Sequence, residues 1–193
     1  LEYRLTRRGK SSPDEKDAAR ILVRNALRAV DFYGAEHMVR INAGAMGLDD
    51  VRATAPHGAQ AYLLPKVEEA DEVRAVSVLL DTLRQSGDTP YPIHLIPILE
   101  SAKGVLNARE IASASPRVAA MAIGLEDYTT DIGAQRSAEG RESLWARSQI
   151  VNAARAAGVQ PLASIYSDMD DTVGFVRWVQ EARQMGFDGV GCL

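Results

Sequence analysis

The chain has 193 residues, enough for one domain with its own core, and its 46% hydrophobic and 25% charged residues exclude a disordered, collagen-like or coiled-coil protein. Its 22 basic and 26 acidic residues give a net charge of −4, with no run of Lys or Arg suited to nucleic acid or to a membrane surface. With a single cysteine and no apolar run or signal pattern for a membrane, we expect a cytoplasmic protein that binds neither nucleic acid nor membrane.

The first predicted element is a helix that runs to about Asp31. Ser12 occupies the capping position, Pro13 the first helical position, and Glu15 completes a capping box. Apolar residues then recur at intervals of three and four, which predicts one buried stripe, and Gly34 follows as the stop signal: Ala18, Ile21, Leu22, Ala26, Ala29 and Val30.

Six short apolar runs along the rest of the chain predict strands, at 37–42, 61–65, 93–99, 118–124, 161–166 and 187–193. Segments with helical periodicity separate them, as at 71–84, 141–157 and 171–185, and the polar stretch 133–140 is typical of a surface loop. A repeat of about 30 residues is the length of a βα unit that builds a parallel sheet. We expect one domain over residues 1–193.

Periodicity leaves two architectures open. One is an open doubly wound sheet, and the other is part of a (β/α)8 barrel, which has about 250 residues in eight units. Six predicted strands are fewer than the eight of a barrel, so the spacing of the strands alone does not choose between the two architectures.

Both architectures place their active site beyond the carboxyl ends of the strands. The residues that follow the predicted strands are polar: Arg40, Asn42, Lys66, Glu68, Glu100, Glu126, Asp127 and Asp168. Each alone is as well explained by a helix cap or a loop hydrogen bond. Their gathering at one rim indicates a site.

Two of these carboxylates are candidates for binding a metal. Glu100 ends the apolar run 95–99, and Asp127 follows the apolar run 121–124 within three residues. Like charges held together at a rim require a cation, and two carboxylates with water and substrate oxygens suit octahedral Mg²⁺. Glu126 competes with Asp127 for this role, and spacing does not separate them.

Arg40 lies within a predicted strand, between Val39 and Ile41. An unpaired guanidinium there is costly, so Arg40 should face an anion. That anion is either Glu68 or a substrate carboxylate.

The sequence lacks the motifs of several other classes of enzyme. The three histidines show no zinc-ligand spacing, and the patterns of serine hydrolases, P-loop NTPases and dinucleotide enzymes do not occur. Cys192 lies in an apolar run and is expected to pack rather than react.

Six segments together resemble the citrate lyase beta chain and malyl-CoA lyase family, within the HpcH/HpaI aldolase and citrate lyase superfamily. The segments are VRIN (39–42), LPKVE (64–68), ILESAKGVLNAREIA (98–112), IGLEDYTTDIG (123–133), ARAAG (154–158) and MGFDGVGCL (185–193).

The resemblance implies a TIM barrel that makes or breaks a carbon–carbon bond between an acyl thioester and a keto acid, with Mg²⁺ as Lewis acid. It implies that Glu100 and Asp127 hold the metal, which resolves the choice against Glu126. It also implies a catalytic, substrate-binding Arg40, and we assign Lys66, Glu68 and Ser101 to substrate binding. The partners would be an acyl-CoA or acyl-carrier thioester and a keto acid, and the assembly a homotrimer or hexamer.

The chain also departs from the family pattern. The family has a first strand and an acidic stretch near the second, whereas here Leu1-Glu2-Tyr3 is the only remnant, with Tyr3 in place of a carboxylate. Family members continue the last strand into His-Pro. We therefore expect a barrel incomplete at both ends. A pyruvate-type aldolase without CoA and a non-catalytic assembly subunit stay open as alternatives.

Overall fold

The structure is a computed structural model that describes residues 2–4, 13–89, 91–137 and 139–191. Seven parallel strands form one sheet, and each strand pairs with the strands that precede and follow it in the chain. The strands are β1 (Glu2–Arg4), β2 (Met38–Arg40), β3 (Ala61–Leu64), β4 (His94–Leu99), β5 (Ala120–Ile123), β6 (Gln160–Ala163) and β7 (Gly189–Val190). This order is that of consecutive βα units.

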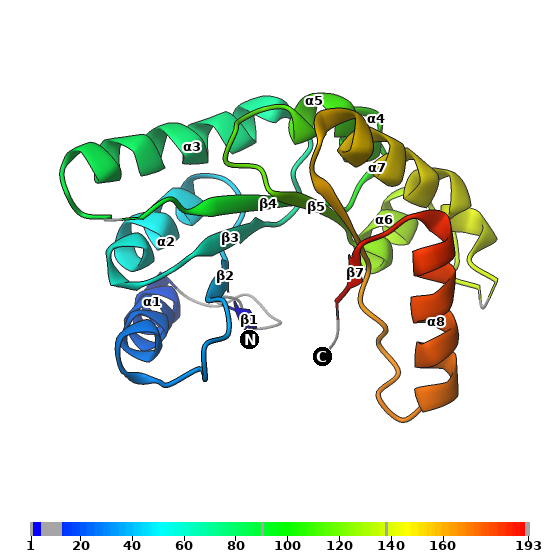
Figure 1. Cartoon of the computed structure of the whole chain (residues 1–193), viewed down its shortest axis with the longest axis horizontal. Helices are drawn as coiled ribbons and strands as arrows, with labels where there is room; N and C mark the ends of the chain where they lie inside the picture. The colour runs from blue at the N-terminus through cyan, green and yellow to red at the C-terminus, as the bar shows by residue number, and fades with distance from the viewer. Residues whose placement is uncertain (1, 5–12, 90, 138, 192–193) are drawn as a thin grey trace.

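Helices connect the strands. They are α1 (Pro13–Ala29), α2 (Ala45–Thr54), α3 (Ala70–Gln85), α4 (Ala102–Leu106), α5 (Ala108–Ala112), α6 (Leu125–Asp131), α7 (Leu144–Ala157) and α8 (Thr172–Met185), with short 3-10 helices η1 (Ala55–His57) and η2 (Arg141–Ser143). The sheet curls into an arch with α3, α5 and α7 on its convex side, and β1 and β7 face each other across the open side (Figure 1). The architecture is therefore an incomplete (β/α) barrel, as predicted, and not a flat doubly wound sheet.

The six predicted strands are confirmed, five of them with tighter bounds, while β6 begins one residue earlier and ends three residues earlier than predicted. A seventh strand, β1, stands where the remnant Leu1-Glu2-Tyr3 was expected, and it pairs Glu2 with Met38. The helix predicted from residue 141 begins as η2 and becomes α-helical at Leu144. The short helices α2, α4, α5 and α6 were not predicted. The predicted cap Ser12 and the predicted packing residue Cys192 lie outside the described residues.

Side chains alternate between the two faces of the sheet, as strand geometry requires. The convex face carries Val39, Tyr62, Leu95 and Met121, all fully buried against the helices. Burying a side chain of this size stabilises the fold by about 1.5–3 kcal/mol. On the concave face, the described residues include a small buried cluster of Ala61, Ile96 and Ala120. The convex core therefore supports the sheet and leaves its concave side available for a cavity.

Candidate functional site

A cavity of about 640 Å³ lies on the concave side of the arch, toward the carboxyl ends of the strands. Its walls are mostly apolar, and five polar or charged side chains line it: Arg40, Glu100, Glu126, Asp127 and Ser164. A few polar groups in an apolar cavity of this size are typical of a site for a small organic molecule.

Glu100 is the buried carboxylate of this cavity. It follows β4 directly, and only 7% of its surface is exposed. Its Oε2 accepts the backbone N–H of Lys66 at 3.0 Å, and its Oε1 lies 3.5 Å from Nη2 of Arg40. Burial raises the pKa of the Glu100 carboxyl, and the charge of Asp127 raises it further, against the opposing effects of Arg40 and the Lys66 N–H. Glu100 is thus a carboxylate that a further cation would stabilise.

Gly124 provides the space that Glu100 occupies. A Cβ atom at Gly124 would lie 2.6 Å from both Cγ and Oε1 of Glu100, closer than packed atoms approach. The backbone φ of Gly124 is −105°, a value open to any residue, so the requirement for glycine here is steric. The residue that precedes α6 therefore fixes where the Glu100 carboxylate lies.

The first turn of α6 carries both Glu126 and Asp127, and their contacts differ. Asp127 Oδ2 lies 3.1 Å from Nζ of Lys66, whereas Glu126 Oε1 lies 2.7 Å from Nη1 of Arg136 in the following loop. The charge of Asp127 also contributes to the raised pKa of Glu100, and Glu126 is not among the causes of that shift. The geometry favours Asp127 over Glu126 as the second carboxylate.

The other three predicted substrate residues, Lys66, Glu68 and Ser101, are not among the residues that line the cavity. The Glu68 carboxylate faces Lys103 at 3.8 Å, while Arg40 faces Glu100. The alternative in which Arg40 pairs with Glu68 is therefore wrong. Ser101 caps α4, and its Oγ accepts the N–H of Gly104 at 3.1 Å.

Two residues of the predicted rim hold local structure instead. Asn42 donates its backbone N–H and its side-chain N–H to Asp50 Oδ2 at 2.8 and 2.7 Å. Asp168 accepts the N–H of Asp170 within its own loop at 3.2 Å. Neither lines the cavity.

Ser164 is a lining residue that sequence reasoning missed. Its Oγ accepts the N–H of Leu125 at 3.3 Å, and its carbonyl oxygen accepts Nε1–H of Trp178 at 3.1 Å. The predicted strand ran through residue 166, but β6 ends at Ala163, so Ser164 stands at the strand end after all. A search for polar residues at strand ends would find Ser164 only if the end of β6 were already known.

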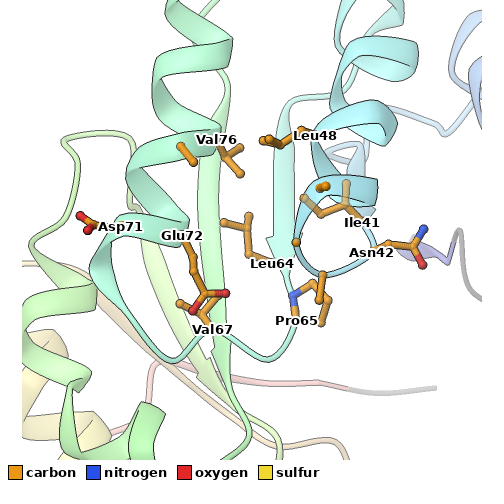
Figure 2. A pocket seen from close by; sticks show the side chains of 13 residues that line it. Ile41, Asn42, Leu48, Leu64, Pro65, Val67, Asp71, Glu72 and Val76 are labelled. Atoms are coloured by element: carbon orange, nitrogen blue, oxygen red, sulfur yellow. The ribbon is translucent and has the colours of Figure 1, made fainter.

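A second cavity, of about 420 Å³, opens between α2 and α3 (Figure 2) and differs in character. Apolar side chains such as Leu48, Leu64 and Val76 line it. Its acidic residues already have partners, because Glu72 accepts the N–H groups of residues 68 and 69 at 2.8 and 2.9 Å and Asp71 pairs with Arg74 at 2.6 Å. This groove holds no charged group that is poised for chemistry.

The donor set of the first cavity suits a magnesium ion. Within the part of the chain that the structure describes, no three His, Cys, Asp or Glu side chains gather into a complete metal cage. Mg²⁺ does not need one, because it keeps several waters and binds through one or two carboxylates together with substrate oxygens. Glu100 and Asp127 meet that requirement.

The fold and the cavity define a class: a parallel (β/α) barrel, here incomplete, with a cavity at the carboxyl ends of its strands, where barrels of this kind carry their sites. Residues 9–193 match the family model of the HpcH/HpaI aldolase/citrate lyase family. The chain belongs to this family, and the resemblance seen in its sequence is confirmed.

Characterised relatives are similar over most of this chain. Citrate lyase subunit beta from Leuconostoc mesenteroides is 41% identical over 182 residues, which cover 91% of this chain and 59% of that protein. Mitochondrial citramalyl-CoA lyase from Mus musculus is 32% identical, covering 91% of this chain and 56% of that protein. The chain thus spans less than two thirds of the length of these relatives.

Solved structures agree with the fold. Protein CitE from Mycobacterium tuberculosis, in complex with magnesium and acetate, is 29% identical and matches with a TM-score of 0.77 over 100% of this chain and 75% of its own. A citrate lyase beta subunit from the same organism, complexed with oxaloacetate and magnesium, is 30% identical, with a TM-score of 0.77 over 100% and 80% of the two chains.

The described helices include none long and apolar enough to cross a bilayer.

Proposed function

We propose that this chain carries the active site of a Mg²⁺-dependent carbon–carbon lyase. The substrate would be a 3-hydroxyacyl thioester, such as malyl-CoA, citramalyl-CoA or a citryl thioester, and the products an acyl thioester and a keto acid. The observation that carries the proposal is the buried Glu100 at one cavity with Asp127 and Arg40. The names of the relatives and the magnesium in two similar structures support it.

Glu100 and Asp127 would hold the metal, and a bound Mg²⁺ would serve as a Lewis acid toward the oxygens of the keto acid. In the cleavage direction, the bond between the hydroxyl-bearing carbon and the thioester α-carbon breaks. The hydroxyl proton leaves, the hydroxyl oxygen becomes the keto oxygen, and the α-carbon takes up a proton.

Arg40 lies beside Glu100 and is 18% exposed, so its guanidinium is available to a ligand in the cavity. It would bind the oxygen on which negative charge develops, or the neighbouring carboxylate. The apolar walls, including Ile96, Ile98 and Leu162, exclude water and so strengthen this interaction.

The remaining predicted residues would act from the edge of the cavity. Lys66 is 60% exposed and would reach a carboxylate of the substrate. Glu68 and Ser101 also lie outside the cavity lining and would contact the longer thioester portion. The group that moves the proton at the α-carbon is not assigned to a residue of this chain.

We further propose that the active protein is cytoplasmic and that it assembles as a homotrimer or hexamer. The composition supports the first point. The second is supported by the strands β1 and β7, each of which has one neighbour in the described sheet, since exposed strand edges favour coverage by other protein.

The proposal is tested by incubating the protein with malyl-CoA or citramalyl-CoA and Mg²⁺ and measuring the keto acid formed. We expect cleavage that EDTA abolishes and that Glu100→Ala abolishes. Cleavage of a 4-hydroxy-2-keto acid without any thioester cleavage would instead identify a pyruvate-type aldolase. A protein that cleaves neither, and whose melting temperature is unchanged by Mg²⁺ with a keto acid, would be an assembly subunit.

A further inference from the structure

Lys66 has an unusual backbone. Its φ is 55°, in the left-handed region that residues with a Cβ rarely adopt, and it lies in the turn that follows β3. Such strain persists only where the surrounding structure enforces it, and it gathers at functional sites. The contacts of Lys66 with the carboxylates of the cavity account for this conformation.

The left-handed turn directs two nitrogens of one residue to two different carboxylates. The backbone N–H donates to Oε2 of Glu100 at 3.0 Å, and the ammonium lies 3.1 Å from Oδ2 of Asp127. These are the two carboxylates assigned to the metal. Lys66 is therefore a single residue that contacts both.

The two contacts differ in how easily they exchange. The Glu100 contact joins a backbone group to a carboxylate that is 7% exposed, so it is fixed. The Asp127 contact joins side chains that are 60% and 49% exposed. Exposed ion pairs of this kind are weak, and the four-carbon stem of lysine is flexible.

We propose that Lys66 is a placeholder cation of the site. Its ammonium neutralises Asp127 while no metal is bound, and it turns to the carboxylate of the keto acid once a divalent ion takes Asp127. This inference rests on the proposed function and adds to it an exchange between metal and side chain.

The backbone N–H of Lys66 keeps its bond to Glu100 in both states, so the buried carboxylate does not move. Before the divalent ion arrives, Arg40 faces Glu100 and Lys66 faces Asp127, so each carboxylate has one cation. The divalent ion then adds two positive charges, and the substrate carboxylate offsets one of them beside the displaced ammonium. Two negative side chains at one cavity are never left without a counter-charge.

The test measures two affinities by titration calorimetry, first that of Mn²⁺ and then that of pyruvate at saturating Mn²⁺. In Lys66→Met we expect Mn²⁺ to bind about five-fold more tightly, because it no longer displaces an ammonium, and pyruvate about ten-fold more weakly, because its carboxylate loses a partner. Lys66→Gly should show the same two changes in affinity. It keeps the backbone N–H and relieves the left-handed strain, so it provides the test if Lys66→Met does not fold.

Lys103→Met is the matched control. Lys103 is 54% exposed and pairs with Glu69 and Glu68, neither of which is assigned to the metal, so both affinities should stay as in the unsubstituted protein. The opposite signs expected for the Lys66 variants separate an exchange from a merely structural role, which would weaken both ligands.

Unchanged Mn²⁺ affinity in both Lys66 variants overturns the inference, and so does a loss of both affinities. If the unsubstituted protein binds Mn²⁺ and cleaves the thioester in either case, the proposed function survives that result. If the unsubstituted protein binds no Mn²⁺, the proposed function fails first and the placeholder role fails with it.

Discussion

Asp50 and Glu100 are both buried carboxylates, yet their surroundings differ. Asp50 is fully buried in α2, where Arg20 Nε donates to its Oδ1 at 2.7 Å and Asn42 donates twice to its Oδ2. Glu100 receives one backbone N–H and a guanidinium at 3.5 Å, beside a cavity. Burial is common to both. The room left for another cation distinguishes the carboxylate suited to chemistry from the one that serves the fold.

Asp50 serves the fold, but it also affects the site indirectly. Asp50 fixes both the backbone and the side chain of Asn42, two residues beyond Arg40 in the chain. The end of β2 is thereby held in place, and with it the strand that presents the guanidinium to the cavity.

The largest effect is expected for Glu100→Gln. The amide cannot bind a divalent ion as the carboxylate does, so thioester cleavage should fall by about 100- to 1,000-fold. The free energy of unfolding near neutral pH should stay the same or rise, because a neutral group replaces a charge that burial disfavours. Steady-state kinetics and urea unfolding measure the two quantities. Retained cleavage would contradict the role of Glu100.

Asp50→Asn should show the opposite pattern, with lost stability as the primary effect. It removes the buried charge that Arg20 faces, leaves Asp17 as the carboxylate partner of that guanidinium, and weakens the bonds to Asn42, so the free energy of unfolding should fall by about 1–3 kcal/mol in urea titrations. Asp49→Asn is the matched control. Asp49 and its partner Arg52 are 57% and 54% exposed, and the loss should stay below about 0.5 kcal/mol. Equal losses in both variants would refute the distinction.

Gly124→Ala tests the space around Glu100. The added methyl group would push the carboxylate from its position, so Mn²⁺ affinity should fall by about ten-fold and the free energy of unfolding by about 1–3 kcal/mol. Calorimetry and urea unfolding check both. Adding Glu100→Asp, which shortens the side chain, should recover part of the lost stability, and no recovery would show that the methyl group collides elsewhere.

The smallest effect concerns pH. The pKa of Glu100 is raised above its ordinary 4.5, so the folded protein holds this proton more tightly than the unfolded chain. In EDTA, the stability of the unsubstituted protein relative to Glu100→Gln should be greatest below that value and should fall as pH rises through the raised pKa. The change is about 1.4 kcal/mol per unit of pKa difference. A relative stability that rises with pH over this window would contradict the assignment.

The parallel sheet and the rim residues could be predicted because apolar runs of strand length, spaced by one βα unit, are visible in the sequence, whereas the choice of a barrel over an open sheet came from the family resemblance. Glu100 follows such a run immediately. The partner of Arg40 could not be predicted, because Glu100 lies beyond β3, on the next strand but one, and only the curl of the sheet brings the two together.

Other features depend on geometry that residue types do not specify. The left-handed turn of Lys66 carries no glycine or asparagine to announce it. Ser164 was missed because β6 ends at Ala163, before the predicted end of that strand. Asp50 was missed because α2, which has a short apolar stripe, was not predicted. The metal role of Glu100 and Asp127 stays a prediction until binding is measured.

The chain-order pairing of the sheet has a consequence for how the molecule opens. Among the seven described strands, none inserts between two earlier ones, so the sheet can lose strands from either end, one βα unit at a time. Amide hydrogens of β4 and β5 should then exchange with solvent most slowly, and those of the two-residue β7 most quickly. Glu100 and Gly124 directly follow these central strands, so fraying at the termini would leave the carboxylate site intact.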